Sequence, residues 1–397
     1  MERRKVTALT CPQLDFPVDN SASHPRVAFR SCQADRMTLS SVPPPDVLLP
    51  AYPTLLPGIH VLERDDNEIQ FGLDRRYGII ANGLPPAIVD SVRRLDGRRL
   101  LEDVLLAVGE HRDQFHLLLK QLTALGLVTE AAKKNVKRVE TGVWSLRARH
   151  YQPALTDRRW QSLIAVHGSG RIAVAVAALL ATSGVGHLDI RASGTVTEAD
   201  LGSGFTPAEL GQPRQRAIRN VVARVAPDVT TARNQRRLPD LVLLTDTLVP
   251  PPEEVAELVD SATTHLPVRV CEGTGIVGPL VVPGRSACLR CCDLHRTDAD
   301  LSWPRIATQL VGRIPRADLG AVHACASLAV AQAMRLLSPS ETRPPAWNAT
   351  LEIDSFDGNL HRRIWEPHPD CGCGAPVPVE DAPEAAEAAS EEALQET

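Results

Sequence analysis

The segment Ser162-Leu-Ile-Ala-Val-His-Gly168-Ser-Gly170-Arg-Ile-Ala173 joins a short apolar run to a glycine turn and to the start of an apolar helical pattern. Residues 163–166 predict a buried strand, residues 172–182 a helix and residues 187–191 a second strand. Strand, helix and strand in this order form a βαβ unit. The fold is therefore predicted to be α/β, with a Rossmann-like, mostly parallel sheet.

The turn fits the pattern G-x-G-x-x-G/A, in which glycines let the backbone approach a phosphate group at a helix N-terminus. Gly168, Gly170 and Arg171 are thus candidates for nucleotide binding. The alternative is that small residues only permit tight packing of strand and helix. A ribose-binding Asp or Glu is expected after the second strand, but Ala192-Ser-Gly194 stands there, and Asp189 lies inside the strand and is expected to face away from the turn.

Four of the nine cysteines form two close pairs, Cys288-Leu-Arg-Cys291 and Cys371-Gly-Cys373. Two thiolates from each pair would complete the tetrahedral site of a structural Zn2+ ion. A redox role for Cys-x-x-Cys would need a thioredoxin-like surrounding, which the sequence lacks. The adjoining Cys292 shows no local His and acid arrangement that marks a nucleophile, and its role stays open. His295 and His368 are possible substitute ligands.

Composition favours a reducing compartment, so we expect a cytoplasmic protein. The chain has 397 residues, of which 43% are apolar, and an odd number of cysteines. It shows neither a secretory signal nor an uncharged apolar run of about 18 residues, which argues against a membrane partner. The formal charge of −5 arises from the tail 380–397, which holds seven acids and no base. The rest is nearly neutral, and nothing indicates nucleic acid.

Five segments are expected along the chain. Residues 1–54 form an extended or disordered leader, in which Met37 offers an alternative translation start. Residues 55–130 form a small winged-helix-like α+β domain, with a hairpin over 59–72 and helices over 85–95, 100–108 and 115–125. A linker over 131–159, the Rossmann-like domain over 160–374 and an acidic disordered tail over 375–397 follow.

Within the large domain, further elements are expected after the βαβ unit. They are strands over 241–244, 267–270 and 349–354, helices over 253–261 and 321–337, and a glycine-rich loop or hairpin over 273–283. His323 and Cys325 lie on the long apolar helix 321–337 and are expected to be core or interface residues.

The order of motifs over residues 160–374 resembles the ThiF family of ubiquitin-activating-type enzymes. The motifs are the glycine turn, Ala181-Thr-Ser-Gly-Val-Gly186, Gly211-Gln-Pro-Arg214 and Gly278-Pro-Leu-Val-Val-Pro-Gly284 leading to the first cysteine pair. More narrowly, residues 288–296 and 367–373 resemble the ThiF-like component found with YcaO proteins in azoline peptide biosynthesis. For a working adenylyltransferase of this family, the resemblance adds Arg214 as a possible nucleotide contact.

The small domain is similar to the PqqD-like peptide-recognition element, through Pro57-Gly58, Phe71-Gly-Leu73, Leu95-Asp-Gly97 and residues 122–127. In that family a leader peptide adds as a strand beside the hairpin. Ile69 and Phe71 of the hairpin are therefore candidate peptide-binding residues.

Taken together, the two resemblances imply a protein that binds the leader of a precursor peptide as the partner of a YcaO-type cyclodehydratase. Because the ribose-binding acid is missing, this protein is expected to have no adenylation activity of its own. The alternatives are an ATP-dependent ThiF-type adenylyltransferase and a regulatory peptide-binding protein. The expected cofactor is structural Zn2+, ATP is a possible one, and homodimerisation is an expectation from the family.

Overall fold

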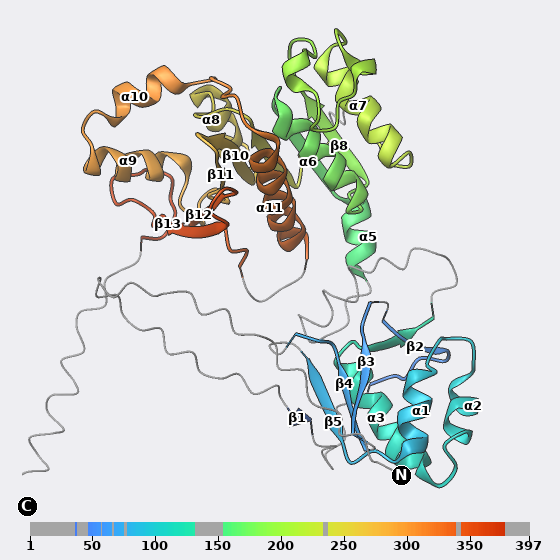
Figure 1. Cartoon of the computed structure of the whole chain (residues 1–397). Helices are drawn as coiled ribbons and strands as arrows, with labels where there is room; N and C mark the ends of the chain where they lie inside the picture. The colour runs from blue at the N-terminus through green and yellow to red at the C-terminus, as the bar shows by residue number, and fades with distance from the viewer. Residues whose placement is uncertain are drawn as a thin grey trace, which may run out of the picture.

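The computed structural model describes residues 36–37, 47–56, 58–65, 67–74, 78–131, 154–232, 237–338 and 343–377 (Figure 1). Most of the expected leader, linker and acidic tail lies outside these residues. The described elements form two parts, a small α+β domain before residue 132 and a larger α/β domain from residue 154.

The small domain begins with the expected hairpin, β3 (Val61–Asp65) and β4 (Glu68–Phe71), which pair antiparallel. The strand β5 (Ile79–Asn82), which was not predicted, extends this sheet, and β1 (Arg36–Met37) pairs with β5 in parallel. The sheet order is thus β1-β5-β4-β3. One side of the hairpin is apolar, because Ile69 and Phe71 alternate with polar neighbours.

Three helices cover that apolar side and confirm the predicted helical segments. They are α1 (Pro86–Arg93), α2 (Leu101–Leu106) and α3 (Arg112–Ala124), and a short 3-10 turn, η1 (Gly109–His111), precedes the third. A separate pair, β2 (Pro53–Leu55) and β6 (Val128–Glu130), joins the two ends of the domain. The strand β2 begins at Pro53, two residues before the expected start of this domain at residue 55.

The large domain contains a seven-stranded sheet of order β13-β12-β11-β10-β9-β7-β8. Its parallel half confirms the predicted Rossmann-like arrangement. The parallel strands are β7 (Leu163–His167), β8 (His187–Arg191), β9 (Leu241–Thr245) and β10 (His265–Cys271). The antiparallel strands are β11 (Thr274–Val277), β12 (Ala349–Asp354) and β13 (Asn359–Ile364).

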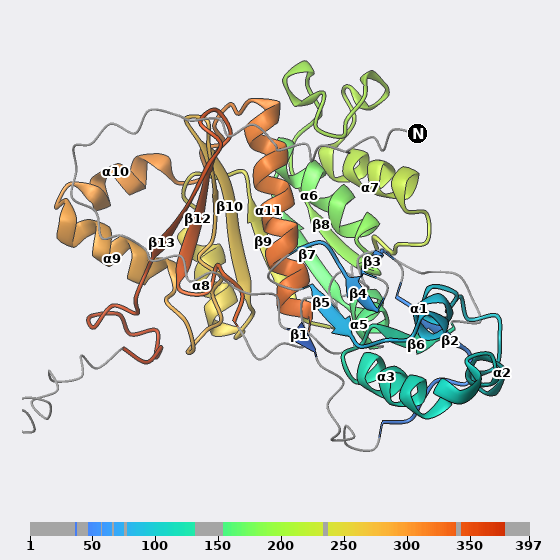
Figure 2. The same ribbon diagram turned by 60° about the horizontal axis from the view of Figure 1, so that its bottom comes forward.

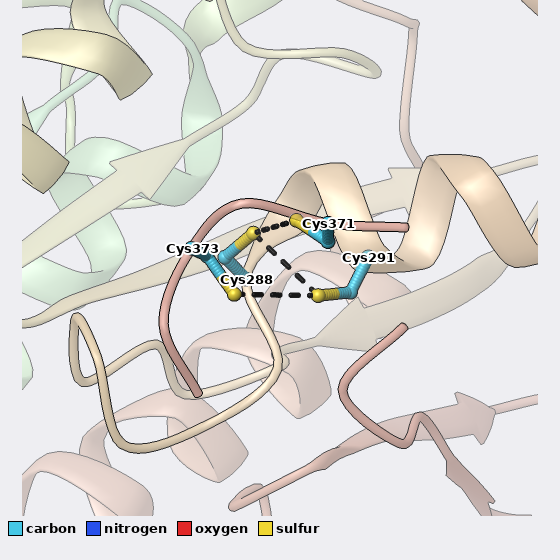
Figure 3. Close-up of side chains that lie close together, drawn as sticks. All are labelled: Cys288, Cys291, Cys371 and Cys373. Carbon is cyan, nitrogen blue, oxygen red and sulfur yellow. Dashed lines mark hydrogen bonds between the residues drawn. The ribbon is translucent and has the colours of Figure 1, made fainter. Parts of the chain in front are cut away.

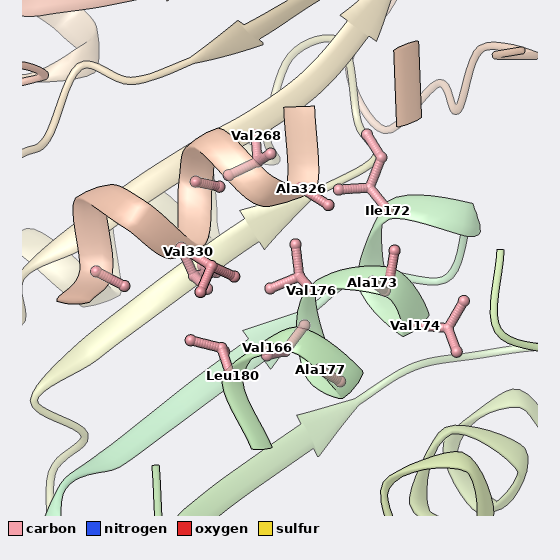
Figure 4. Close-up of a cluster of buried hydrophobic side chains, with 14 of the residues drawn as sticks. Val166, Ile172, Ala173, Val174, Val176, Ala177, Leu180, Val268, Ala326 and Val330 are labelled. Carbon is pink, nitrogen blue, oxygen red and sulfur yellow. The ribbon is translucent and has the colours of Figure 1, made fainter. Parts of the chain in front are cut away.

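Helices lie on both faces of this sheet (Figure 2). The apolar faces of β7, β9 and β10 pack against α6 (Arg171–Thr182), α7 (Arg214–Val225) and α11 (Leu319–Leu337). Figure 4 shows Val176 and Leu180 of α6 meeting Val330 of α11 in this core. On the opposite face, α8 (Pro252–Asp260) packs Leu258 against a smaller apolar cluster.

The remaining elements lie at the start of the domain, in the loop after β8 and near β13. The helix α5 (Ala154–Gln161) lies mainly within the range expected to be linker and leads directly into β7. Two 3-10 turns, η2 (Glu198–Asp200) and η3 (Pro207–Glu209), follow β8. The helices α9 (Leu289–Ala299) and α10 (Trp303–Leu310) precede α11.

One helix among the described residues, α11, is long and apolar enough by composition to cross a membrane. Its buried side chains include Val322, Cys325 and Met334, and they belong to the core that covers the sheet. The helix therefore serves here as a core helix, as expected for Cys325.

Candidate functional site

The two cysteine pairs come together although about 80 residues separate them in sequence (Figure 3). Cys288 and Cys291 lie at the first turn of α9, and the segment after β13 brings Cys371 and Cys373 against them. The Sγ of Cys288 lies 3.7 Å from that of Cys291 and 3.6 Å from that of Cys371, and the Sγ atoms of Cys291 and Cys373 are 3.6 Å apart. The four thiols could hold one metal ion.

The spacing of these sulfur atoms fits zinc. With Zn–S bonds of about 2.3 Å, a tetrahedron places its sulfur atoms about 3.8 Å apart. The closeness of the thiols also couples their ionisation: the hydrogen bond from Cys288 lowers the pKa of Cys291 to about 4, and the same bond raises the pKa of Cys288. Four thiolates at these distances repel one another, so a cation is needed to hold them all ionised.

The substitute ligands His295 and His368 do not enter the four-cysteine cluster. They form a second group with Asp298, in which one ligand atom from each residue lies within 4.8 Å of the others. The ring of His368 is 5% exposed, and its Nε2 lies 2.8 Å from Asp298 Oδ2. His368 also accepts a hydrogen bond from the Asp370 N–H at Nδ1. Both ring nitrogens of His368 thus have hydrogen-bond partners, and this group is a hydrogen-bonded polar cluster beside the cysteines.

At the glycine turn, the side chain of Asp246 occupies the N-terminus of α6. Its Oδ2 accepts hydrogen bonds from the Gly170 N–H at 2.9 Å and the Ala173 N–H at 3.3 Å, and its Oδ1 accepts one from the Ile172 N–H at 2.9 Å. Asp246 directly follows β9 and has a φ of 74°, a conformation that is uncommon outside glycine. Burial raises the pKa of Asp246, and this effect outweighs the opposing effect of the N–H donors.

The two glycines of the turn make room for this carboxylate and its neighbour. A Cβ atom on Gly168 would lie 1.8 Å from Thr245 Oγ1, and one on Gly170 would lie 2.4 Å from Asp246 Oδ1. Close packing of the protein on itself thus accounts for both glycines. The helix N–H groups that would bind a phosphate already have a partner, and Ala192 and Gly194 supply no acid for a ribose. In this structure the N–H groups of Gly170, Ile172 and Ala173 bind the Asp246 carboxylate.

The two arginines among the nucleotide candidates, Arg171 and Arg214, border a cavity of about 340 Å3 beside Gly170. Arg171 donates a hydrogen bond to the Ala317 carbonyl at 2.8 Å, and Arg214 donates one to Asp200 Oδ2 at 2.8 Å. Burial raises the pKa of Asp200, but hydrogen bonds from Arg214 and Thr197 outweigh it and lower that pKa overall. Both arginines are therefore held by groups of the protein itself.

Gly168, in contrast, borders a separate cavity of about 550 Å3, here called the crevice cavity, at the carboxyl ends of β7, β8 and β9. His167 and Glu254 lie in its wall with His167 Nδ1 2.6 Å from Glu254 Oε1. Asp189 also lies in the wall, and Arg191 Nε donates to its Oδ2 at 3.4 Å. The expectation that Asp189 faces away from the turn region is wrong, since its side chain borders the same cavity as Gly168.

The peptide-binding candidates Ile69 and Phe71 are both 0% exposed. Their side chains pack with α1 and α3 in the core of the small domain. The prediction that these side chains contact a peptide is therefore wrong, because alternation along β4 turns both of them into the core. Among the strands that the structure describes, the outer strand β3 pairs only with β4, and its Leu62 is 37% exposed.

The contacts of Asp246, His167 and Glu254 were not predicted from the sequence. The position of Asp246 after a predicted strand contained the signal, because the carboxyl ends of neighbouring parallel strands meet at one edge of a sheet. Its partners could not be inferred, since they depend on which strand lies next to β7. His167 and Glu254 lie 87 positions apart and offered no local pattern.

Comparison with known proteins bears on the large domain and on the overall fold. No curated protein sequence matches this chain. Among solved structures, E. coli MccB with MccA-N7isoAsn aligns at a TM-score of 0.61 and 14% identity, covering 81% of this chain and 99% of MccB. E. coli MccB with ATP gives a TM-score of 0.60 at 14% identity, with the same coverage. Selenomethionyl PaaA gives 0.57 at 17% identity, covering 78% of this chain and 99% of PaaA.

At such identities these structures establish similarity of fold and nothing further. The family model supplies the stronger finding, since the ThiF family model matches residues 147–375, more than half of the chain. That range contains the βαβ unit, the glycine turn and all four clustered cysteines. The chain belongs to the ThiF family.

Proposed function

We propose that this protein binds the leader of a precursor peptide and presents it to a YcaO-type cyclodehydratase in azoline peptide biosynthesis, without adenylating a substrate itself. The observation that carries the proposal is the position of Asp246. Its carboxylate accepts the N–H groups of Gly170, Ile172 and Ala173. A phosphate would have to displace a buried carboxylate and would meet its negative charge.

Two further observations support peptide binding. The first is that solved structures of MccB, which shares this fold, include one in complex with N-formylated MccA. The second is the edge strand β3 in the small domain, which we assign as PqqD-like. An edge strand offers unpaired backbone N–H and C=O groups, to which an extended peptide adds as a further strand.

The cysteine cluster is proposed to hold a structural Zn2+ ion. All four positions of a tetrahedron would be filled by Cys288, Cys291, Cys371 and Cys373, which leaves none for a substrate. The ion would fasten the segment after β13 to α9. It would act on stability and leave the chemistry to the partner enzyme.

The test separates peptide binding from nucleotide turnover. The purified chain alone is expected to bind a fluorescently labelled leader peptide and to show no ATP–pyrophosphate exchange. Adding the YcaO-type protein should give ATP-dependent dehydration of the precursor that requires this chain. Pyrophosphate exchange by the chain alone would overturn the proposal.

Variants of the small domain locate the peptide. Leu62→Asp on β3 is expected to weaken leader binding about tenfold or more, because a charge would replace an apolar contact on the edge strand. Leu106→Asp is the matched control, since Leu106 is a 64% exposed leucine on α2 of the same domain. Equal losses in the two variants would exclude β3 as the binding edge.

A ThiF-type adenylyltransferase is the second candidate, and the cavity beside Gly170 favours it. Arg171, Arg214 and the exposed Arg316 border that cavity, which is also adjacent to the glycine turn. This candidate predicts that Arg214→Met abolishes pyrophosphate exchange. The proposed leader-binding protein has no pyrophosphate exchange activity for this substitution to remove.

A further inference from the structure

We infer that His295, Asp298 and His368, here called the His–Asp cluster, form a second metal site, which takes a divalent transition-metal ion such as Zn2+. One ligand atom from each of these residues lies within 4.8 Å of the others. Imidazole and carboxylate groups together are ligands that zinc and its neighbours in the transition series accept. The inference goes beyond the proposed leader binding and the proposed structural zinc, because it adds an ion with different ligands.

The helix α9 and its N-cap residue place ligands of both sites on one face. Along this helix, Cys288, Cys291, His295 and Asp298 follow one another at intervals of three, four and three residues. Residues at such intervals lie above one another on the same face of an α-helix. At a rise of about 1.5 Å per residue, the middle of the second pair lies roughly 10 Å along the helix from the middle of the first. The two pairs therefore belong to two separate sites.

The segment after β13 supplies the remaining ligands of both sites. Its cysteines Cys371 and Cys373 lie against the first turn of α9. His368 lies against the last turn, with its Nε2 2.8 Å from Asp298 Oδ2. The rings of His295 and His368 meet edge to face with their centroids 4.7 Å apart. Each site thus takes two ligands from α9 and the rest from this one segment.

Surrounding groups orient the two histidines and add negative charge. The Glu366 carbonyl oxygen lies 2.9 Å from His295 Nε2, and Asp370 Oδ2 lies 4.0 Å from His368 Nδ1. Carbonyl and carboxylate partners of this kind hold the rings of metal-binding histidines in proteins. The carboxylates of Asp298 and Asp370 both favour a cation at this place.

The His–Asp cluster combines a buried anchor with an open side. The side chain of His368 is 5% exposed and that of Asp298 is 65% exposed. The neighbouring base Arg296 is engaged elsewhere, since it donates a hydrogen bond to Asp293 Oδ1 at 3.0 Å and lies over the Trp303 ring. An ion can therefore reach Asp298 from solvent. Its binding releases the proton held between His368 and Asp298, and water fills the remaining position of the ion.

Metal analysis of the full, untagged chain after dialysis against micromolar Zn2+ tests the assignment. About two zinc ions per chain are expected, one at the four cysteines and one at the His–Asp cluster. Co2+ added to the chain that carries a single zinc ion should give visible absorption without the intense sulfur-to-metal charge transfer of a thiolate site. One zinc ion per chain and no such absorption would overturn the inference.

Variants assign the second ion to its ligands. Asp298→Asn and His295→Ala are each expected to weaken binding of the second ion about tenfold or more and to leave the ion at the cysteines in place. The matched controls are Asp300→Asn, an exposed acid just beyond α9, and His361→Ala, an exposed histidine of β13. Both controls should keep two ions. A second ion that all four variants bind equally tightly would be an adventitious surface ion, and the inference would be wrong.

Leader binding, measured on the same samples, separates this inference from the proposed function. Asp298→Asn should bind the leader peptide as tightly as the unaltered chain, because leader binding is assigned to the small domain. A chain that holds two ions and binds no leader would contradict the proposed function alone. A chain that binds the leader and holds one ion would contradict the second metal site alone. The ion count on the unaltered protein stays decisive if a variant fails to fold.

Discussion

The glycine turn and the cysteine cluster are both motifs whose residues could receive a ligand, and the structure treats them in opposite ways. At the turn, the N–H groups of Gly170, Ile172 and Ala173 already bind the Asp246 carboxylate. At the cluster, neighbouring Sγ atoms of the four cysteines lie 3.6–3.7 Å apart and face one another. A motif therefore predicts ligand binding only when its donor or acceptor groups remain free.

The largest expected effect concerns the cluster. Cys288→Ser should remove about one zinc ion per chain and lower the free energy of unfolding by roughly 5 kcal/mol or more, because binding of a structural zinc contributes directly to folding. Metal analysis and denaturant unfolding measure both quantities. Cys271→Ser, a half-buried cysteine outside the cluster, is the control. An unchanged metal content in Cys288→Ser would remove the site.

The next effect concerns the internal partner of the turn. Asp246→Ala would leave three N–H groups at the start of α6 without an acceptor, and each unsatisfied buried group costs about 1–3 kcal/mol. Some regain water in the vacated space, so the expected loss of unfolding free energy is about 3 kcal/mol at pH 7. Denaturation in urea measures it. If stability were unchanged and ATP binding appeared, the carboxylate would be a replaceable occupant of a phosphate site.

Alanine substitutions at one glycine of each motif compare how tightly the two motifs are packed. Gly170→Ala should cost about 1–3 kcal/mol of stability, since its Cβ would lie 2.4 Å from Asp246 Oδ1 in a packed environment. Gly372→Ala, between the two C-terminal cysteines, adds a Cβ that meets no atom within 4 Å and needs no left-handed backbone. Its stability should stay within about 0.5 kcal/mol. Similar losses would contradict the packing explanation for Gly170.

The smallest effect concerns the arginine beside the turn. Arg214→Met removes the partner of Asp200, whose pKa is held below its ordinary value of 3.8 in the folded protein. A lowered pKa stabilises the fold above the unfolded value and loses that contribution as pH falls through the folded value. The variant should therefore be about 1 kcal/mol less stable at pH 7, with a smaller difference near pH 3. Arg216→Met, an exposed neighbour, should show no such pH dependence.

How far the sequence predicts this molecule depends on how local each signal is. The βαβ unit, the hairpin before residue 72 and helix α11 follow from periodicity within about 20 residues, and all three are confirmed. Strand β13 escaped prediction because every one of its residues is exposed, so it lacks the apolar alternation that marks a half-buried strand.

In the candidate site, too, local patterns could be predicted and distant contacts could not. The cysteine spacing predicted the cluster, because the clustered residues are themselves the sequence pattern. The glycine spacing could not reveal that Asp246, 76 positions beyond Gly170, supplies the acceptor. The prediction of peptide contact by Ile69 and Phe71 failed for a similar reason. The sequence identified them as hairpin residues, but their inward orientation depends on which face of the sheet α1 and α3 cover.

The distance between the cysteine pairs also has a consequence for synthesis on the ribosome. Cys291 emerges about 80 residues before Cys371, which at about 5–20 residues per second amounts to roughly 4–16 seconds. During that interval the chain can offer only half of a tetrahedral site. On the proposed zinc site, metal capture at full affinity waits until β12, β13 and the segment after them have been made. A chain that ended before Cys371 would lack the proposed link between α9 and the segment after β13.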